Sequence, residues 1–405
     1  MEHKDTTRQR LLHELTERID YSRESSDEEI RDLIDELLLR EGRERPLGLA
    51  ERERLQNELF YAIRKLDVIQ ELIEDPTVTE IMINGPENIF IERQGKLSAS
   101  GITFESREKL QDVIQQIVAA CNRVVNEASP IVDARLENGA RVNVVLAPVA
   151  LNGPIVTIRR FPENPITMKD LVTFGSVSEE VCTWLGRLVK AGYNIFISGG
   201  TGSGKTTFLN ALSGYIPREE RIITIEDSAE LQIRGIPNLV SMETRNANVE
   251  GCREISIRDL IRTSLRMRPD RIIVGEVRGG EAFDMMQCLN TGHDGSMSTG
   301  HANSSADMLS RLENMILMGM ELPLAAIRQQ IASGIDIIVH LGRLRDRSRR
   351  VLEIVEVLGY EEGQIRLQTL YQFEETGEDA SGRITGSLNR KGELTYVEKL
   401  RAAGL

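Results

Sequence analysis

Apolar and charged residues alternate with the period of an α-helix through the first part of the chain. Side chains that recur at three- and four-residue spacing predict helices over three stretches, at about 11–19, 30–38 and 49–72. Ser26 followed by Glu29 fits a capping box at the start of the second helix. We expect a small helical bundle, and the same apolar stripes are equally consistent with a surface that docks a partner or a neighbouring subunit.

Between residues 75 and 161 the helical period gives way to short apolar runs that are typical of strands. We expect a helix and four strands, the helix at 110–125 and the strands at 79–84, 88–93, 141–145 and 155–159. This arrangement predicts an α+β domain. Pro162 and Pro165 then fall within four residues and favour an extended path, which makes this stretch the best candidate for a linker.

The segment that follows repeats a strand and then a helix. Apolar runs predict strands at 193–198, 221–225, 271–275 and 335–341. Such alternation is typical of an α/β domain in which helices cover a parallel sheet. After Arg347 we expect a hairpin and then an irregular acidic stretch. The predicted divisions of the chain are a bundle at 1–72, an α+β domain at 75–161, a linker at 162–167, an α/β domain at 168–373 and a tail at 374–405.

The chain of 405 residues is long enough for two or three domains, and its formal net charge of −13 limits the expected partners. An acidic protein is a poor candidate for broad nucleic-acid binding, so none is expected. The four cysteines are far apart and form no C-x-x-C pair, which argues against a zinc ribbon. No run approaches the roughly 18 apolar residues of a membrane span, so membrane contact is expected through a partner.

The most specific motif lies between the predicted strand at 193–198 and a helix-like stretch. Residues 199–206 fit the pattern G-x-x-x-x-G-K-[ST] in its strand–loop–helix context. Glycines let backbone N–H groups converge on phosphate oxygens, and the positive end of the helix faces the same anion. Lys205 can reach the β- and γ-phosphates of a nucleoside triphosphate, and Thr206 can offer its hydroxyl to Mg²⁺. The candidate nucleotide-binding residues are Gly199, Gly200, Thr201, Gly202, Ser203, Gly204, Lys205, Thr206 and Thr207.

A second candidate group lies at the end of another apolar strand. The apolar residues from 271 predict this strand, and Glu276 lies at its carboxyl end, where ligands bind in open α/β sheets. Glu276 is therefore a candidate for catalysis or for Mg²⁺. Many phosphate-loop enzymes place an Asp–Glu pair here, but in this chain Gly275 precedes Glu276. The Mg²⁺-linked carboxylate is then Glu276 itself, acting through water, or comes from elsewhere.

Three acids follow the strand expected near 221–225, namely Glu226, Asp227 and Glu230. Like charges placed this close repel one another unless something cationic lies among them. A bound Mg²⁺ ion and an attacking water would explain why these three acids lie so close together. The start of a helix also favours acids, so a structural interpretation stays open.

His293 and His301 lie in a stretch rich in glycine, serine and threonine, 291–303, which suggests a strand flanked by tight turns. Their spacing does not fit a helical zinc site, and a hydrogen-bonding sensor at the phosphate end fits better. An arginine can stabilise the charge of a transferring phosphoryl group. The residues alone do not choose among Arg135, Arg141, Arg159, Arg160, Arg245 and Arg278.

Taken together, four motifs resemble the secretion ATPase superfamily of type II and type IV secretion systems and type IV pili. They are a Walker A loop at 199–206, an Asp box at 224–231, a Walker B box at 269–278 and a His box at 291–303. Within that superfamily the chain is most similar to the CpaF/TadA-type branch, the tight-adherence (Flp) pilus ATPases. That similarity is carried by residues 79–86, 130–136, 153–161 and 327–333.

The resemblance implies a RecA-like phosphate-loop domain, preceded by a PAS-like α+β domain and a helical bundle. It also implies a homo-hexameric ring that binds ATP and Mg²⁺ between the second and third segments, with a hinge at 162–165. Thr206 and Glu276 would serve the metal. The implied catalytic set is Glu276, Glu230, Glu226, His301, Arg135, Arg141, Arg159 and Arg245.

The implied function is ATP hydrolysis that powers assembly of a pilus, or type II-like secretion, from the cytoplasmic side of the inner membrane. Its expected partners are inner-membrane platform proteins and, indirectly, a pilin. The runner-up is a VirB-type ATPase of type IV secretion or conjugation, because the same motifs occur there. A RecA-like nucleic-acid motor is disfavoured by the acidity and by the lack of aromatic clusters. A scaffold that binds ATP without hydrolysing it is disfavoured by Glu276 and Glu230.

Overall fold

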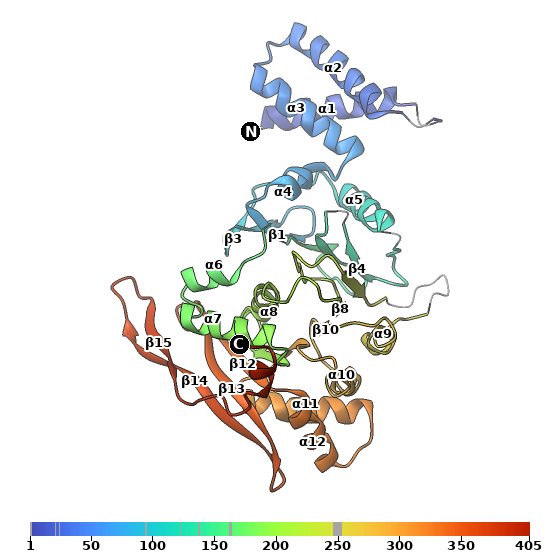
Figure 1. Ribbon diagram of the computed structural model, residues 1–405. Helices are drawn as coiled ribbons and strands as arrows, with labels where there is room; N and C mark the ends of the chain where they lie inside the picture. Colours follow the sequence, from blue (N-terminus) through green and yellow to red (C-terminus); the bar gives the residue numbers. More distant parts are fainter. Residues whose placement is uncertain are drawn as a thin grey trace. The chain divides into compact units, whose positions relative to one another are not determined.

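The computed structural model has two compact units, Met1–Glu163 and Asn164–Leu405, which we describe separately (Figure 1). The first two residues of the predicted linker and hinge lie outside the described residues. Of the side chains of residues 2–6 nothing is described. The rest of the 405-residue chain is described except for Met1, Tyr21, Glu24, Gln94, Asn122, Glu137, Pro162, Glu163 and residues 246–252.

Three helices begin the first unit, and apolar residues from all three form a common core. They are α1 (Glu2–Arg18), α2 (Asp27–Glu44) and α3 (Leu49–Arg64). Fully buried members of this core include Leu11, Leu15, Ile30, Ile34, Leu37 and Leu59. The capping box at the start of α2 is confirmed, because the Ser26 side chain accepts from the Glu29 backbone and the Glu29 side chain accepts in return.

The helix predicted at 49–72 is wrong in its extent, since α3 ends at Arg64 and two short helices follow. These are η1 (Asp67–Ile69) and α4 (Gln70–Glu74). The break begins at Lys65, the C-cap of α3, whose extended backbone has φ −131° and ψ −159°, and Asp67 at the start of η1 has a φ of 49°, in the left-handed region. A guanidinium N–H of Arg8 donates to the buried Asp67 carboxylate at 2.7 Å, so a long-range ion pair fixes the turn. The local apolar spacing could not reveal this contact.

The remainder of the first unit is an antiparallel sheet packed against α5 (Arg107–Ala120), and buried residues of η1 and α4 join the same core. The strand order is β3-β2-β1-β6-β5-β4. Alternate residues of β1, β5 and β6 are buried against α5, as the period of a strand requires. The strands are β1 (Val78–Asn84), β2 (Ile89–Arg93), β3 (Lys96–Ala99), β4 (Ile131–Arg135), β5 (Arg141–Val145) and β6 (Ile155–Arg159).

No apolar pattern predicts β3 or β4. All four residues of β3 are exposed, and β4 buries one residue, Ala134. Both strands lie at the edges of the sheet, where backbone pairing with one neighbour suffices and a buried side-chain face is not required.

The second unit is built on a mixed nine-stranded sheet in the order β15-β14-β13-β12-β7-β11-β10-β8-β9. The six strands from β12 to β9 run parallel, and β13 to β15 extend the sheet in antiparallel fashion. The parallel strands are β7 (Ile195–Gly199), β8 (Ile222–Glu226), β9 (Leu239–Glu243), β10 (Arg271–Val274), β11 (Met297–His301) and β12 (Ile337–Arg343).

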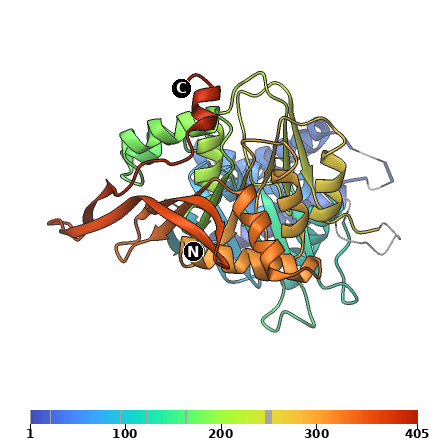
Figure 2. The same cartoon turned by 60° about the horizontal axis from the view of Figure 1, so that its bottom comes forward.

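Helices cover both faces of this sheet, so the unit is an α/β domain as predicted (Figures 1 and 2). One face packs against α6 (Met168–Thr173), α7 (Glu179–Lys190) and α8 (Lys205–Ser213). Every residue of β7, β8 and β10 is buried, and most of them are apolar, as in strands covered on both faces. The other face packs against α9 (Ile257–Ser264), α10 (Glu281–Leu289), α11 (Ser305–Gly319) and α12 (Leu324–Gly334).

The irregular acidic stretch expected after 373 is wrong. Strand β14 (Gln364–Glu378) runs through that boundary from β13 (Arg349–Glu361), and β15 (Ile384–Arg390) and the short α13 (Glu398–Ala402) follow. The acids are tolerated in strands because cations from other segments pair with them. The Arg345 guanidinium contacts Glu375 and Glu378, and Lys391 contacts Glu374. Within the described part of the chain, no helix is long and apolar enough to cross a membrane.

Candidate functional site

The phosphate loop joins β7 directly to α8, and its glycines are required by geometry. Gly202 and Gly204 have φ values of 71° and 94°, which other residues rarely adopt. A Cβ on Gly199 would overlap the Leu341 carbonyl oxygen and lie 2.6 Å from Ser203 Oγ. The loop is therefore fixed against β12 as well as by its own conformation.

A chain of polar contacts leads from this loop to the end of β10. Lys205 Nζ lies 3.2 Å from the Gly200 carbonyl oxygen and 3.1 Å from His301 Nδ1. His301 Nε2 lies 2.9 Å from Glu276 Oε1. The structure thus brings together Lys205, His301 and Glu276, three residues that the sequence assigned to three separate motifs.

Burial shifts the pKa values of two residues in this series of contacts, His301 and Lys205. It lowers the pKa of His301, and the Lys205 ammonium lowers it further against the opposing effect of Glu276. Burial also lowers the pKa of Lys205, against the effect of the Glu276 carboxylate. A neutral His301 can accept from Lys205 at Nδ1 and carry its hydrogen on Nε2, the nitrogen nearer Glu276. The imidazole therefore separates a cation from a carboxylate that would otherwise neutralise each other directly.

Arg278 supplies a positive charge among the acids at this edge of the sheet. Its guanidinium donates to Glu276 Oε2 at 2.8 Å and lies 3.9 Å from Asp227. The hydrogen bond to Glu276 raises the pKa of Arg278 most. The negative charges of Glu276, Asp227 and Glu230 raise it further. In this structure the cation among the carboxylates is an arginine. The alternative of a helix start is wrong, because residues 227–238 form no helix.

Glu226 occupies the space that a larger residue at position 275 would need. A Cβ on Gly275 would lie 2.8 Å from Glu226 Cγ. Glu226 Oε1 accepts from the backbone N–H groups of Glu230 and Leu231, at 2.9 and 3.0 Å. Burial raises the pKa of Glu226 to about 7. The glycine of the Gly-Glu ending is thus explained by the carboxyl group of the neighbouring strand, which also holds the loop that carries Glu230.

The residues near the loop fit a magnesium ion that is held largely by phosphate and water. Thr206 is the second residue of α8, beside the phosphate loop. Glu276 Oε1 is buried and has no well-aligned hydrogen-bond donor among the described residues. In that same part of the chain no three His, Cys, Asp or Glu side chains are grouped so as to hold a metal by themselves. This is the donor set expected for Mg²⁺ that binds through a carboxylate and substrate phosphates.

Three of the predicted arginines form a row in the first unit. Arg135 lies directly opposite Arg141 in the β4–β5 pair, and Arg141 lies directly opposite Arg159 in the β5–β6 pair. Residues directly opposite one another point to the same face of a sheet, so we call these three residues the arginine row. Their strand neighbours Ala134, Val142 and Ile158 are buried on the other face. The row therefore lies on the sheet face opposite the core.

The other predicted residues lie outside both groups. Arg245 pairs with Ile255 in an isolated bridge, and its guanidinium donates to the Arg253 carbonyl oxygen at 3.1 Å. Arg160 donates to backbone carbonyl oxygens, including that of Val78 at 3.3 Å. His293 contacts the Cys288 carbonyl oxygen at 3.3 Å. These three side chains are occupied by contacts that stabilise local backbone.

The sequence reasoning missed a buried polar network behind the loop. His340 lies opposite Ser198 on one side and Glu353 on the other. Its Nδ1 is 2.8 Å from Ser198 Oγ, and Ser305 Oγ donates to Glu353 at 2.7 Å. Burial lowers the pKa of His340. The network connects the strand before the phosphate loop to the start of α11, and a lone histidine in an apolar strand is the signal that could have revealed it.

The comparisons with known proteins agree with these motifs. A family model described as Type II/IV secretion system protein matches residues 63–386. A putative conjugal transfer protein of Mycobacterium tuberculosis is 34% identical over 323 residues, which cover 78% of this chain and 90% of that protein. The conjugal transfer protein TrbB of Rhizobium radiobacter is 33% identical over 323 residues, which cover 77% of this chain and 95% of that one.

The solved structures contribute evidence about the fold. The Legionella pneumophila ATPase DotB gives a TM-score of 0.51 at 21% identity, covering 73% of this chain and 80% of that one. At this level of identity the likeness shows a common fold. The family match spans both the β1–β6 sheet and the phosphate loop, so it includes every residue placed above. The chain therefore belongs to the family of type II/IV secretion system proteins.

Proposed function

We propose that this protein is a Mg²⁺-dependent ATPase that binds ATP at the loop between β7 and α8. The observation that supports this proposal most directly is the contact chain from Lys205 through His301 to Glu276. It joins a phosphate-binding cation to a carboxylate suited to activating water. In this proposal the second unit is a RecA-like domain, and the β1–β6 sheet with α5 is the PAS-like domain that precedes it.

The hydrolysis needs a positioned water and stabilised charge on the γ-phosphate. Lys205 and the backbone N–H groups of the loop bind the phosphates. Glu276 orients the water or accepts its proton. His301 keeps Lys205 and Glu276 from forming a direct ion pair, so that the cation stays directed to phosphate and the carboxylate to water. Bound Mg²⁺, held by Thr206 and through water by Glu276, would supply charge stabilisation at the β- and γ-phosphates.

Glu226 and Glu230 have different roles in this proposal. Glu226 holds the backbone of the following loop and so acts as a positioning residue. Glu230 lies near Arg278, which also contacts Glu276. Movement of Arg278 toward a bound γ-phosphate would leave Glu276 and Glu230 to act on the water.

The proposal assigns the phosphate clamp to the arginine row. Like charges opposite one another on neighbouring strands are unfavourable, and Asp133, 3.8 Å from Arg141, offsets part of that cost. A bound phosphate would accept charge-assisted hydrogen bonds from the row. The arginines would reach a nucleotide in the same subunit or in the next subunit of a homo-hexameric ring. Arg245, whose guanidinium donates to the Arg253 carbonyl oxygen, is not part of the proposed clamp.

Two machines are candidates for the work that hydrolysis drives. The first-unit motifs at 79–86 and 130–136 favour a tight-adherence pilus, with inner-membrane platform proteins as direct partners and a pilin as an indirect one. The conjugal-transfer relatives favour a VirB-type type IV secretion or conjugation system. Either proposal places the protein at the cytoplasmic side of the inner membrane, docked through partners and not through nucleic acid.

A cross-linking pull-down from the native host tests this assignment. The bait is the full chain with Glu276→Gln, which should hold ATP without hydrolysing it, and the matched control is Lys205→Ala, which should hold none. Recovery of small polytopic membrane proteins and a pilin with the first bait alone would support the pilus. Recovery of conjugation-channel components would support type IV secretion. Identical recovery with both baits would contradict a nucleotide-dependent motor, as would the lack of ATP hydrolysis by the unsubstituted protein.

A further inference from the structure

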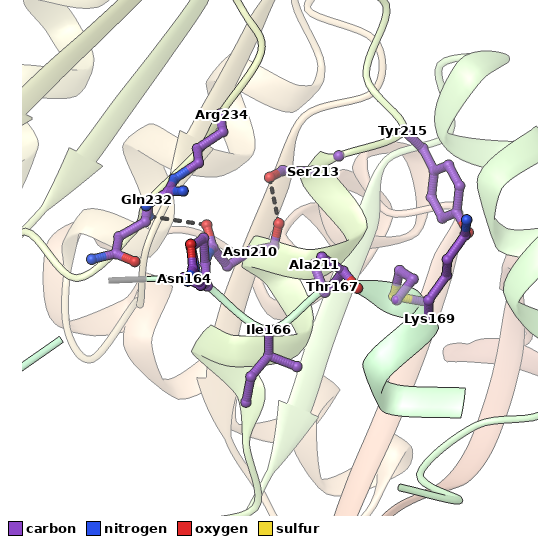
Figure 3. A pocket seen from close by; sticks show the side chains of 13 residues that line it. Asn164, Ile166, Thr167, Lys169, Asn210, Ala211, Ser213, Tyr215, Gln232 and Arg234 are labelled. Atoms are coloured by element: carbon purple, nitrogen blue, oxygen red, sulfur yellow. Dashed lines mark hydrogen bonds between the residues drawn. The ribbon is translucent and has the colours of Figure 1, made fainter. Parts of the chain in front are cut away.

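The two ends of α8 are held differently. The carboxyl end borders a cavity of about 550 Å³ within the second unit, and Figure 3 shows Asn210 and Ser213 among the residues that line it. The contacts drawn there are local, since Asn210 Oδ1 accepts from the Gln232 backbone N–H at 3.0 Å and Ser213 Oγ donates to the Asn210 carbonyl oxygen at 2.6 Å. A side of a helix that faces open space has no atoms there to fix its position. The position of the phosphate loop therefore depends strongly on the contacts at the other end of α8.

His340 lies directly behind that loop, on a central strand of the sheet. It is on β12, opposite Ser198 of β7, and Ser198 immediately precedes Gly199, the first residue of the loop. The Nδ1 atom of His340 is 2.8 Å from Ser198 Oγ, and the two residues are 6% and 0% exposed. A buried polar group that loses its partner is unfavourable, so this pair is held together.

The same ring contacts the segment that follows His301. Burial lowers the pKa of His340, and the Glu353 carboxylate and a hydrogen bond to the Asn303 backbone oppose that effect. A hydrogen bond that favours the protonated ring is one that the ring donates, so its acceptor is the Asn303 carbonyl oxygen. Because Nδ1 lies against Ser198 Oγ, the donor is Nε2, and the neutral ring accepts from the serine hydroxyl at Nδ1.

These two contacts join two segments that meet at the phosphate loop. In the β7–β11 pair His301 lies opposite Gly199, and the backbone N–H of Ala302 donates to the Gly199 carbonyl oxygen at 3.4 Å. Asn303 follows directly. His340 thus connects the residue before the loop to the residue two positions after His301, through one side chain.

Glu353 holds the other side of this network. It lies opposite His340 on β13, where the pairing of the two strands shifts register between His340 and Leu341. A β-bulge of this kind re-aims the side chains beside it. Ser305, the first residue of α11, is 1% exposed and donates to the Glu353 carboxylate at 2.7 Å. The start of α11 and the end of β11 are therefore held by the same group of buried residues.

We propose that His340 is a positioning residue for ATP hydrolysis, which holds the strand before the phosphate loop at a fixed distance from the segment after His301. The inference rests on the proposed function and adds a residue that acts through others. The 3.1 Å contact between Lys205 Nζ and His301 Nδ1 spans the same two segments, because Lys205 begins α8 and His301 ends β11. If the segments separate, this contact lengthens and His301 moves relative to Glu276. The rate of a reaction depends steeply on such alignment.

Two substitutions of His340 each keep one of its two hydrogen bonds. In His340→Asn the amide oxygen takes the place of Nδ1 and still accepts from Ser198, whereas the bond to Asn303 is lost. In His340→Gln the amide nitrogen takes the place of Nε2 and still donates to the Asn303 carbonyl oxygen, whereas the bond to Ser198 is lost. A residue that acts by joining two segments needs both bonds, so we expect each variant to lower kcat about tenfold.

The test measures kcat and KM of the full chain for ATP with Mg²⁺. KM should stay within about twofold, because His340 is not among the groups proposed to bind phosphate. Ser198→Ala breaks the same bond as His340→Gln, so each should lower kcat about tenfold and the double substitution should lower it no further. The matched control is Ser213→Ala, which also removes the hydrogen bond of a buried serine, at the far end of α8, and should leave kcat unchanged.

The outcomes separate this inference from the proposed function. If the unsubstituted protein does not hydrolyse ATP, the proposed function fails and this inference fails with it. If the unsubstituted protein hydrolyses ATP and either His340→Asn or His340→Gln does so at the same rate, one bond suffices and the joining role is wrong. A double substitution whose loss equals the product of the two single losses would also overturn it, as would a rise in KM at unchanged kcat. Where a substitution of His340 prevents folding, Ser198→Ala and Ser213→Ala remain as a matched pair, and equal kcat in both would contradict the proposal.

Discussion

The charged groups near the phosphate loop and the arginine row of the first unit are held in opposite ways. Lys205, His301, Glu276 and Arg278 contact one another in a continuous chain. Lys205 itself is 7% exposed, although it is the residue proposed to bind phosphate. The arginine row lies on the sheet face opposite the core, where its neighbours Asp133 and Glu80 are not buried.

The difference indicates that the two groups of residues have different roles. Lys205, His301 and Glu276, which we call the buried set, are held by contacts with one another before any ligand arrives, which favours chemistry that depends on geometry. The arginine row shares its sheet face with acids, since Asp133 lies 3.8 Å from Arg141 and Glu80 lies opposite Arg159. Such exposed ion pairs are weak and can be replaced by a phosphate, which favours a contact that forms and breaks. We expect substitutions in the buried set to remove binding and chemistry together. Substitutions in the row should change the rate far more than the affinity.

The largest effect is expected from the buried set. Lys205→Ala removes the cation at the loop and leaves His301 Nδ1 without its donor. We expect the rate of ATP hydrolysis to fall about 1,000-fold, with a parallel loss of ATP binding. Lys190→Ala, on the exposed end of α7, is the matched control and should hydrolyse ATP normally. Undiminished turnover by Lys205→Ala would show that the loop does not carry the reaction.

A smaller effect is expected from the arginine row. Arg141→Ala removes its central residue, and we expect kcat to fall about 100-fold, less than the full value of an arginine finger because two arginines remain. ATP affinity should change little. The control is Arg107→Ala, at the exposed start of α5 on the other side of the sheet. Equal losses of affinity and kcat would abolish the distinction between the row and the buried set.

Glu226 extends the comparison to stability. Burial raises its pKa to about 7 from a reference value of 4.5, so the folded state holds a proton that the unfolded state releases. The stability that this bound proton contributes to the folded state is fully present below pH 4.5 and is lost as the pH rises through 7. The free energy of unfolding of Glu226→Gln should therefore rise relative to that of the unsubstituted protein, by up to about 3 kcal/mol between pH 4.5 and pH 8.

Urea unfolding at several pH values measures this gain. The one tryptophan of the chain, Trp184, packs on Tyr371 in the second unit, so its fluorescence reports on that unit. The stability difference between the two proteins should be small at pH 5 and largest above pH 7.5. A difference that is independent of pH would contradict the assigned titration of Glu226.

The smallest effect concerns the contact between Gly275 and Glu226. Gly275→Ala places a Cβ 2.8 Å from Glu226 Cγ, so the side chain and the loop it holds must shift. We expect about a tenfold lower kcat and a loss of about 1 kcal/mol in stability. Shortening the partner, in Gly275→Ala with Glu226→Asp, should recover part of the stability. Gly42→Ala, where a Cβ meets nothing within 4 Å, is the control. Normal kinetics for Gly275→Ala would show that the contact between Gly275 and Glu226 does not position the site.

Much of the second unit could be predicted because strands buried on both faces are rich in apolar residues. β7, β8, β10 and β12 all lie within a residue or two of the ranges that the apolar runs indicate. The strand expected in the stretch 291–303 is confirmed as β11. The tail could not be predicted, since its acids pair with Arg345 and Lys391, and such pairs depend on tertiary contacts that local sequence does not specify.

The site was predictable as a set of motifs and not as a set of contacts. The glycine pattern indicated the loop, and the end of an apolar strand indicated Glu276. Which cation lies among the acids could not be predicted, because Arg278 approaches Asp227 and Glu230 only after β8 and β10 pair. The arginine row likewise depends on strand register, which places three distant arginines side by side.

The central claim is that the loop holds ATP while Glu276 drives its hydrolysis. The most direct test is a single-turnover measurement with radiolabelled ATP and Mg²⁺, followed by identification of the nucleotide that stays bound. The account predicts that Glu276→Gln retains intact ATP and hydrolyses it between about 100- and 10,000-fold more slowly than the unsubstituted protein, which should retain ADP or nothing. Conversion of ATP to ADP by Glu276→Gln at the unsubstituted rate would contradict it.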